Sequence, residues 1–282
     1  MNLALKYFVV VLLFFSNFSI GQNHNLFILG TLPEDLSEAS GLEILNDTTL
    51  ISINDGGNGA EIFLLNLNGS LQRKITVLNE KNNDWEDVTR DENFLYIADI
   101  GNNNNTRNRL VILKINLNDI KTKDEVRAEK IYFKYKEQTA FPPEKENKKF
   151  DAEAIVSIGD SLLILTKTNT IPWTGKSQLY YVSKLPGIYT ISVSSELFIG
   201  SNGWYVDAIT AADFLNEKLY ILTYNRLIVF NFANKRPKRV FELKFDQLTQ
   251  KEGIVAKNEK EWYIIDERHR VFGGGNLLKA KK

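Results

Sequence analysis

The sequence predicts an all-β fold, and within that class a single β-propeller of five four-stranded blades. Three observations predict it. Short strand-forming segments bounded by turn residues recur along the chain, a related tripeptide precedes each of them, and no long segment has the 3.6-residue period of a helix. The strand-forming segments lie at residues 50–53, 94–98, 162–165, 219–222 and 262–265.

The N-terminus is typical of a secretory signal peptide over residues 1–21, which leaves residues 22–282 for the propeller domain. Lys6 is followed by an apolar run at residues 7–15, and Ser19 and Gly21 are suitable small residues for cleavage. The run is too short to span a bilayer, and no second candidate follows it. We therefore expect a secreted or periplasmic protein without a membrane span, the alternative being an uncleaved membrane anchor.

The composition excludes several classes of protein. The chain has no cysteine, which rules out disulfides, thiolate metal sites and a lipid-modified N-terminal cysteine. Its 35 basic residues balance 35 acidic ones, so there is no basic excess of the kind that nucleic-acid binders carry. We expect no nucleic-acid partner.

The repeated tripeptide marks the start of each blade. It reads polar, then small, then aliphatic, with Asp87 as the one exception to a small middle residue. Its successive first positions are 46, 67, 54 and 45 residues apart. The shorter spacings suit a four-stranded blade, and loops explain the longer ones. A sixth blade is the alternative if residues 101–150 hold more strand. The five copies are Ser40-Gly41-Leu42, Glu86-Asp87-Val88, Glu153-Ala154-Ile155, Asp207-Ala208-Ile209 and Glu252-Gly253-Ile254.

The third and fourth strands of a unit follow in order. They are predicted at residues 61–65 and 72–77 in the first unit, 110–115 and 130–133 in the second, and 227–232 and 239–243 in the fourth. Residues 119–130 are polar and broken, typical of a loop or one helical turn. The fifth unit lacks a fourth strand, and residues 26–29 offer a spare one. Pairing the two closes the ring and hides two sheet edges.

A propeller of this kind brings acidic side chains to one mouth of its channel. The first strand of each blade lines the channel and runs antiparallel to the second, so the start of one and the end of the other share a face. The residues placed there are Ser40, Glu86, Glu153, Asp207 and Glu252 at the starts, with Glu38, Asp84 and Asp151 two positions earlier, and Asp55, Asp99, Lys167, Tyr224 and Asp266 at the ends.

So many carboxylates repel one another unless a cation compensates them. Ca²⁺ takes six to eight oxygen ligands from flexible loops, and the Asn- and Gly-rich turns after Asp55 and Asp99 are rich in oxygen donors. The alternative is that each acid accepts backbone amides of the next blade and joins blade to blade. The candidate metal ligands are Glu86, Glu153, Asp207, Glu252, Asp99 and Asp55.

Other polar and aromatic residues are expected on the same face. Trp173 lies in a polar loop and favours a ligand contact, whereas Trp85 and Trp204 favour packing beside a blade start, and Trp262 lies inside a strand. The sequence holds no nucleophile elbow and no phosphate-binding loop, and the setting of His269 between two arginines favours a solvated turn. The candidate ligand-binding residues are Lys167, Trp173, Arg107, Arg268 and Tyr224.

Several of these segments resemble a group of exported bacterial propellers related to the phytase-like and SdiA-regulated propellers. The Asp-Ala-Glu-Ala of that group precedes a Thr-Lys pair, which Thr166-Lys167 matches; its Arg-Thr-Tyr is Leu222-Thr223-Tyr224 here, without the arginine. The resemblance implies a propeller and Ca²⁺ binding but no defined reaction. The segments are Ser40-Gly41-Leu42, Asn54-Asp55-Gly56-Gly57, Asp84-Trp85-Glu86-Asp87, Asp99-Ile100-Gly101-Asn102, Asp151-Ala152-Glu153-Ala154 and Lys251-Glu252-Gly253-Ile254.

Three functions follow as expectations. The first is a secreted propeller that binds a glycan, peptide or protein at an acidic, Ca²⁺-holding mouth. The second is a metal-dependent phosphoesterase, because phytases of this architecture hold phosphate with Ca²⁺ together with lysine and arginine, a part that Lys167, Arg107 and Arg268 would play. The third is an interaction scaffold without metal.

Overall fold

The structure is a computed structural model that describes residues 25–233 and 236–282. The predicted signal peptide and its cleavage site lie outside the described residues. Within the described residues, none of the helices has both the length and the apolar character needed to cross a membrane.

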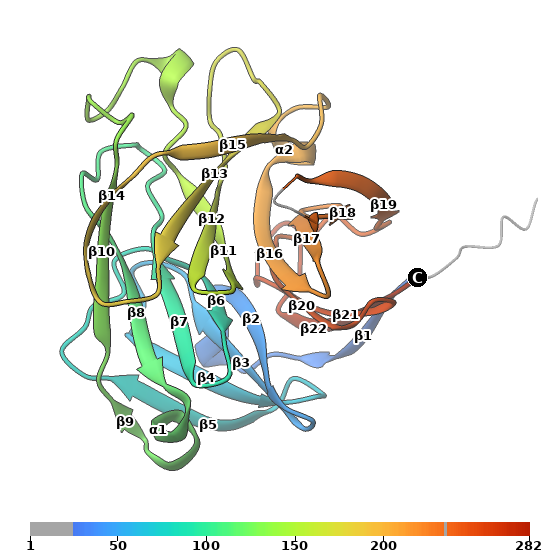
Figure 1. Cartoon of the computed structure of the whole chain (residues 1–282). Helices are drawn as coiled ribbons and strands as arrows, with labels where there is room; N and C mark the ends of the chain where they lie inside the picture. The colour runs from blue at the N-terminus through green and yellow to red at the C-terminus, as the bar shows by residue number, and fades with distance from the viewer. Residues whose placement is uncertain (1–24, 234–235) are drawn as a thin grey trace, which may run out of the picture.

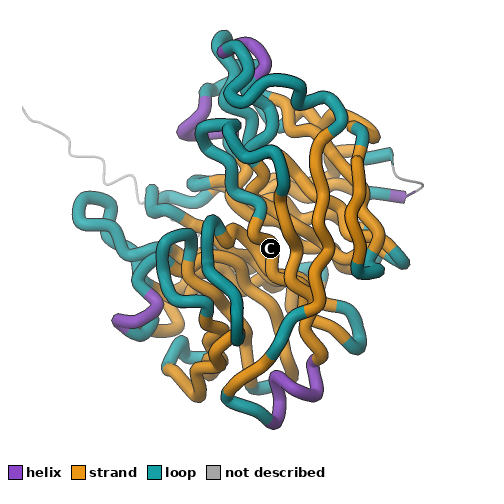
Figure 2. Tube along the Cα trace, turned by 90° about the vertical axis from the view of Figure 1, so that its left-hand side faces the viewer, coloured by secondary structure: helices purple, strands orange, loops and turns teal. Residues whose placement is uncertain are grey.

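The chain folds into a five-bladed β-propeller, as the sequence predicts (Figure 1). The first strand of each blade contacts the first strands of its neighbours, so these strands surround the channel. Strands make up most of the chain, and the helices are short (Figure 2). The first two blades are β2 (Ala39–Asn46), β3 (Thr49–Asn54), β4 (Glu61–Asn66) and β5 (Leu71–Val77), then β6 (Trp85–Arg90), β7 (Phe94–Asp99), β8 (Leu110–Asn116) and β10 (Glu129–Tyr135).

The remaining blades follow in chain order. They are β11 (Ala152–Ile158), β12 (Ser161–Thr166), β13 (Lys176–Ser183) and β15 (Val193–Phe198); β16 (Ile209–Leu215), β17 (Lys218–Thr223), β18 (Arg226–Asn231) and β19 (Lys238–Lys244); and β20 (Lys251–Asn258), β21 (Glu261–Asp266), β22 (Asn276–Lys281) and β1 (Leu26–Thr31).

The N-terminal strand completes the last blade. β1 pairs antiparallel with β22, so the first and last described segments of the chain share one sheet (Figure 1). This confirms the predicted closure, in which the spare strand at residues 26–29 supplies the missing fourth strand.

Two short strands join neighbouring blades at their outer edges. β9 (Glu125–Val126) pairs parallel with β5 of blade 1, and β14 (Gly187–Ile191) pairs parallel with β10 of blade 2. β9 lies within residues 119–130, for which the sequence predicts a loop or one helical turn, and β14 lies in a segment to which the sequence analysis assigns no element. Residues 101–150 hold β8, β9 and β10 but no sixth blade. The helical segments given for the described residues are η1 (Glu34–Leu36), α1 (Leu117–Thr122), η2 (Lys145–Asn147) and α2 (Trp204–Asp207).

The hydrophobic core lies between adjacent blades. One buried cluster packs β3 and β4 of blade 1 against β6 and β7 of blade 2, and similar clusters fill the other gaps. Each sheet is therefore covered on both faces, which explains why a strand such as residues 162–165 is apolar without alternation. Trp85 and Trp262 are fully buried, so both are core residues as predicted.

Buried carboxylates also join the blades, through backbone amides. Glu43 of blade 1 accepts from the Arg90 amide at 3.1 Å, Asp87 of blade 2 accepts from Ile155 at 3.0 Å, and Asp213 of blade 4 accepts from Ala256 at 2.7 Å. Asp151, which the sequence places at the channel mouth, has the same role, because its Oδ1 accepts from the Asn102 amide of blade 2 at 2.8 Å. The blade-joining alternative therefore applies to one of the acids predicted at the mouth as well as to Glu43, Asp87 and Asp213.

Candidate functional site

The starts of the inner strands surround a cavity of about 210 Å³ at one end of the channel, here called the channel mouth. Glu86, Glu153 and Glu252 each stand where the pairing of strand one with strand two shifts by one residue, and such a bulge redirects a side chain. The lining residues are Glu38, Ala39, Ser40, Asp55, Glu86, Asn103, Glu153, Lys167, Trp204, Tyr224, Gln250, Glu252 and Glu267.

The second strands contribute the residue that directly follows each strand. Asp55, Lys167, Tyr224 and Glu267 follow β3, β12, β17 and β21, and all four line the mouth. Asp99, in contrast, is the last residue of β7 itself. Because successive side chains of a strand point to opposite faces, this one-residue difference turns Asp99 away from the cavity. The same one-residue offset applies in the last blade: the sequence predicts Asp266, the last residue of β21, at the mouth, whereas the next residue, Glu267, lines it.

The channel mouth is strongly acidic. Its lining holds six carboxylates, on Glu38, Asp55, Glu86, Glu153, Glu252 and Glu267, against the single ammonium group of Lys167. Like charges in a partly buried space resist ionisation together. The mouth therefore has an excess of negative charge unless protons or a cation offset it.

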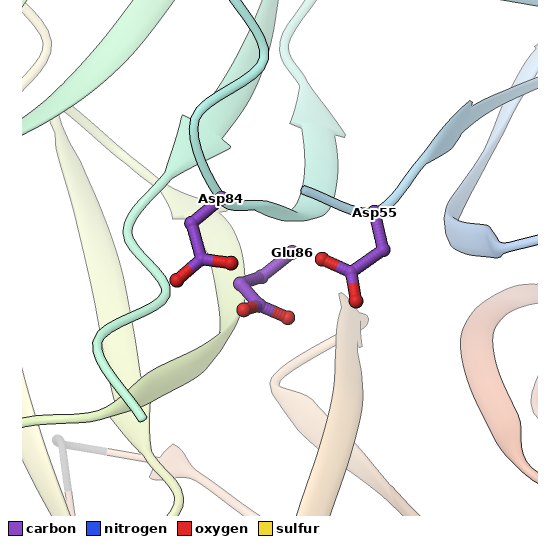
Figure 3. Close-up of side chains that lie close together, drawn as sticks. All are labelled: Asp55, Asp84 and Glu86. Carbon is purple, nitrogen blue, oxygen red and sulfur yellow. The ribbon is translucent and has the colours of Figure 1, made fainter. Parts of the chain in front are cut away.

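Two of these acids, Asp55 and Glu86, form a tight group with Asp84, which does not itself line the cavity. One carboxylate oxygen from each lies within 4.8 Å of the others, and Figure 3 shows Glu86 between the two aspartates. Asp84 and Glu86 come from the approach to β6 and from its start, and Asp55 comes from the turn after β3. We call these three residues the carboxylate triad.

Two glycines make room for the carboxylate triad. A β-carbon on Gly101 would collide with the carboxylates of Glu86 and Asp84, and one on Gly56 would lie 2.6 Å from Asp84 Oδ1. Glu86 is only 5 % exposed, and its side chain has no hydrogen-bond partner among the described residues. A buried, unpartnered carboxylate is costly, so the arrangement is suited to a positively charged ligand.

The local electrostatics favour the protonated forms of these acids when no cation is bound. Burial, and secondarily the charges of Glu153 and Asp84, raise the pKa of Asp55 to about 7. Burial followed by the charge of Glu153 raises the pKa of Glu86 well above its usual range. Burial also raises the pKa of Asp84, although the Arg107 guanidinium partly opposes it.

Lys167 faces the acids from blade 3. Its Nζ lies 3.2 Å from Glu153 Oε1 and 3.4 Å from the hydroxyl oxygen of Tyr224. Nζ also lies 5.0 Å from the centre of the Trp204 ring, a cation–π distance. Burial works against the ammonium, but the charges of Glu153 and its neighbours outweigh it and raise the pKa of Lys167. Lys167 is thus a fixed cation in the mouth.

Two predicted metal ligands lie outside the channel mouth, each paired with an arginine. Asp99 Oδ1 accepts from Arg107 at 2.6 Å, which also takes Arg107 away from the mouth. Asp207 belongs to α2, is fully buried and pairs with Arg226. The pairing shift of blade 4 falls at Thr210, so the true counterpart of Glu86 lies three residues after Asp207. Blade 4 therefore places no carboxylate at this position.

The other two predicted ligand-binding residues also lie elsewhere. The Arg268 guanidinium donates to the Leu32 carbonyl at 3.1 Å, and the Arg268 backbone amide donates to the Ser37 carbonyl. These bonds tie the last blade to the N-terminal segment. Trp173 does not line the channel mouth, and its indole nitrogen is buried without a partner.

Trp204, rather than Trp173, is the tryptophan that lines the channel mouth, together with Tyr224. It was expected to be a packing residue, but α2 holds it against the cavity, with its ring 6.0 Å from that of Tyr224. Trp204, Tyr224 and Gln250 also line an adjoining cavity of about 280 Å³, whose other walls include Leu248 and Phe272. An acidic space and an aromatic space thus meet at these three residues.

The comparisons with known proteins support the fold alone. No protein-family model matches the chain. No curated protein matches it by sequence. Among solved structures, the glutaminyl cyclase of Myxococcus xanthus is similar, with a TM-score of 0.53 and 10% identity over 91% of this chain and 94% of that one. A luciferin-regenerating enzyme gives a TM-score of 0.48 at 10% identity, over 91% and 95% of the two chains. Such low identity carries no inference about activity.

Proposed function

We propose that the protein is an exported propeller of the phytase-like and SdiA-regulated kind, and that it binds a ligand at a channel mouth holding Ca²⁺ on Asp55, Asp84 and Glu86. The observation that carries the proposal is the buried carboxylate of Glu86, which stands without a partner between two other carboxylates. A cation would compensate all three acids at once.

The donor set fits Ca²⁺ in kind and in spacing. Ca²⁺ binds oxygen at about 2.3–2.6 Å, so two of its ligands lie at most about 5 Å apart. The carboxylate triad meets this limit, with oxygens within 4.8 Å of one another. Mg²⁺ binds at about 2.0–2.1 Å and would require the acids to move closer. Bound there, Ca²⁺ would offer positive charge to an anionic or hydroxyl-rich group of the ligand.

The aromatic side chains favour a glycan or a peptide as the ligand. Trp204 and Tyr224 form a wall shared by the acidic and the aromatic cavities, and aromatic faces of this kind bind sugar rings and apolar side chains. The ligand would place a polar group near the acids and a ring or apolar group against Trp204.

Calcium binding is the test of this proposal. Isothermal calorimetry on metal-free protein should show Ca²⁺ binding that Glu86→Gln or Asp55→Asn weakens at least about tenfold, the size expected for the loss of one charged contact. Glu43→Gln is the matched control, because Glu43 is also a buried carboxylate but has its own partners. Absence of Ca²⁺ binding, or equal weakening in the control, would overturn the proposal.

A phosphoesterase is the second candidate, and Lys167 is the observation that favours it. Its ammonium group stands beside the acids and could hold a phosphate oxygen while Glu153, 3.2 Å away, accepts a proton from a water molecule that attacks phosphorus. The P–O bond to the alcohol then breaks, and the alcohol leaves with a proton from solvent. Calcium-dependent turnover of a generic phosphoester that is lost in Glu153→Gln would support this activity. Calcium binding without turnover would leave the ligand-binding function.

A further inference from the structure

A second cavity, of about 750 Å³, lies on blade 2, and we call it the basic pocket. It is built by the loop before β8, the end of β10 with the residues that follow it, and one residue of β14. The parallel pairing of β14 with β10 places Thr190 opposite Lys134 and so completes one wall. The lining residues are Arg107, Asn108, Arg109, Leu110, Lys134, Tyr135, Lys136, Gln138, Thr139, Phe141 and Thr190.

The charge of the basic pocket is opposite to that of the channel mouth. Four of its lining residues are cationic and none is acidic. Asp99 neutralises Arg107, but Arg109, Lys134 and Lys136 have no ion-pair partner among the residues that the structure describes. In a chain whose charges balance, three uncompensated cations around one cavity repel one another and attract an anion.

The two lysines of the basic pocket share one face of the chain. Lys134 and Lys136 stand two positions apart at the end of β10, and both are exposed, whereas Tyr135 between them is 3 % exposed. The ring of Tyr135 packs in the core against Phe150 and Tyr180, and its hydroxyl is buried there. The cations therefore point to the same side, away from the core.

The remaining walls suit an organic anion rather than a bare ion. The volume far exceeds that of one phosphate, and Phe141 is 44 % exposed beside the cations. The Thr139 and Thr190 side chains add hydroxyl groups. An aromatic ring next to cations and hydroxyls can hold the ring of a sugar or base whose ester group reaches the cations.

We propose that the basic pocket binds a small organic phosphate or sulfate ester, with Arg109, Lys134 and Lys136 holding the oxyanion. This site is separate from the proposed Ca²⁺ site, because the two cavities share no lining residue.

Calorimetry in calcium-free buffer with a chelator tests the proposal. The probes are pyrophosphate and a sulfated heparin disaccharide, titrated into the full protein. At least one should bind, and the affinity should fall as the salt concentration rises. Tighter binding of pyrophosphate would identify a phosphate ester, and tighter binding of the disaccharide a sulfate ester. Failure of both probes to bind would overturn the proposal.

Variants separate this pocket from other basic surfaces. Lys134→Gln with Lys136→Gln should weaken binding about tenfold or more, as expected for lost charged hydrogen bonds. Lys121→Gln with Lys257→Gln is the matched control, since both lysines are exposed and outside the basic pocket. Equal loss in the control double variant would show nonspecific attraction and overturn the site.

One further variant tests the independence of the site. Glu86→Gln should leave anion binding unchanged even if it abolishes Ca²⁺ binding. Failure of the Ca²⁺ site would therefore leave this proposal standing.

Discussion

In blade 2, Glu86 and Asp87 are consecutive residues whose carboxylates have opposite surroundings. Asp87 accepts backbone amides from Ile155 and Val88, at 3.0 and 2.8 Å, and so joins blade 2 to blade 3. Glu86 is buried among other acids without such a partner. The Asp87 carboxylate thus stabilises the contact between two blades, whereas the Glu86 carboxylate adds an acidic group that makes no such contact.

This contrast predicts opposite effects of two conservative substitutions on metal-free protein. Glu86→Gln should raise the free energy of unfolding by roughly 1–2 kcal/mol, because it removes a buried acid from like charges. Asp87→Asn should lower it by a similar amount, because it weakens the join between blades. Urea unfolding measures both. A loss of stability in Glu86→Gln would show that this carboxylate is structural.

Glu43 predicts a dependence of stability on pH. Burial, then the charge of Asp213, raises its pKa to about 8, although Arg90 opposes the shift. The folded protein therefore holds a proton that the unfolded chain releases above about pH 4.5. The resulting stabilisation is present below pH 4.5 and is lost as the pH rises through about 8.

Glu43→Gln should remove part of this loss, on the order of 1–3 kcal/mol. The measurement is the free energy of unfolding of wild type and variant in chelator from pH 5 to 9. Because Asp55 contributes a change of the same sign, the difference between the two proteins isolates Glu43. Parallel curves would contradict the assignment.

Among the elements, the inner strands show how far sequence reasoning reaches. Their existence and their order could be predicted, because the polar-small-aliphatic start and the apolar run after it are local patterns. The positions of the bulges could not be predicted from the sequence, because a bulge depends on how the strand packs against the neighbouring blade. In blade 4 the tripeptide that begins at Asp207 therefore lies three residues before the bulge residue, Thr210.

The same limit explains the partners of the acids. Asp99 and Glu86 look alike in the sequence, as acids at the edge of a strand-forming segment. Only the folded structure shows that the Asp99 carboxylate accepts hydrogen bonds from the Arg107 and Asn83 side chains, at 2.6 and 2.7 Å. The Glu86 carboxylate has no such donor among the described residues. The sequence therefore predicts that the mouth is acidic. It does not predict which acids form hydrogen bonds within the fold and which remain for a ligand.

The closing strand predicts a large effect of a short deletion. A chain that begins at Leu32 lacks β1, which leaves β22 as an exposed edge and removes the cover from the core of blade 5. We expect a loss of more than about 10 °C in melting temperature, or aggregation. A chain beginning at Asn25 is the control, and equal melting of the two would refute the closure.

At the scale of the whole molecule, the propeller sorts the charges of a neutral chain. Turns and strand starts far apart in the sequence bring carboxylates to the channel mouth, and blade 2 gathers cations on its own cavity. Neither concentration shows in the net charge. Two ligands of opposite charge, a divalent cation and an oxyanion ester, are the binding partners that this arrangement favours.

The location of bound calcium tests this account most directly. Crystals grown with Ca²⁺ should give an anomalous difference peak about 2.3–2.6 Å from one oxygen of each of Asp55, Asp84 and Glu86. The peak should vanish in Glu86→Gln crystals. A map of the Ca²⁺-grown crystals without density among these carboxylates, or with the ion bound elsewhere, would contradict the central claim.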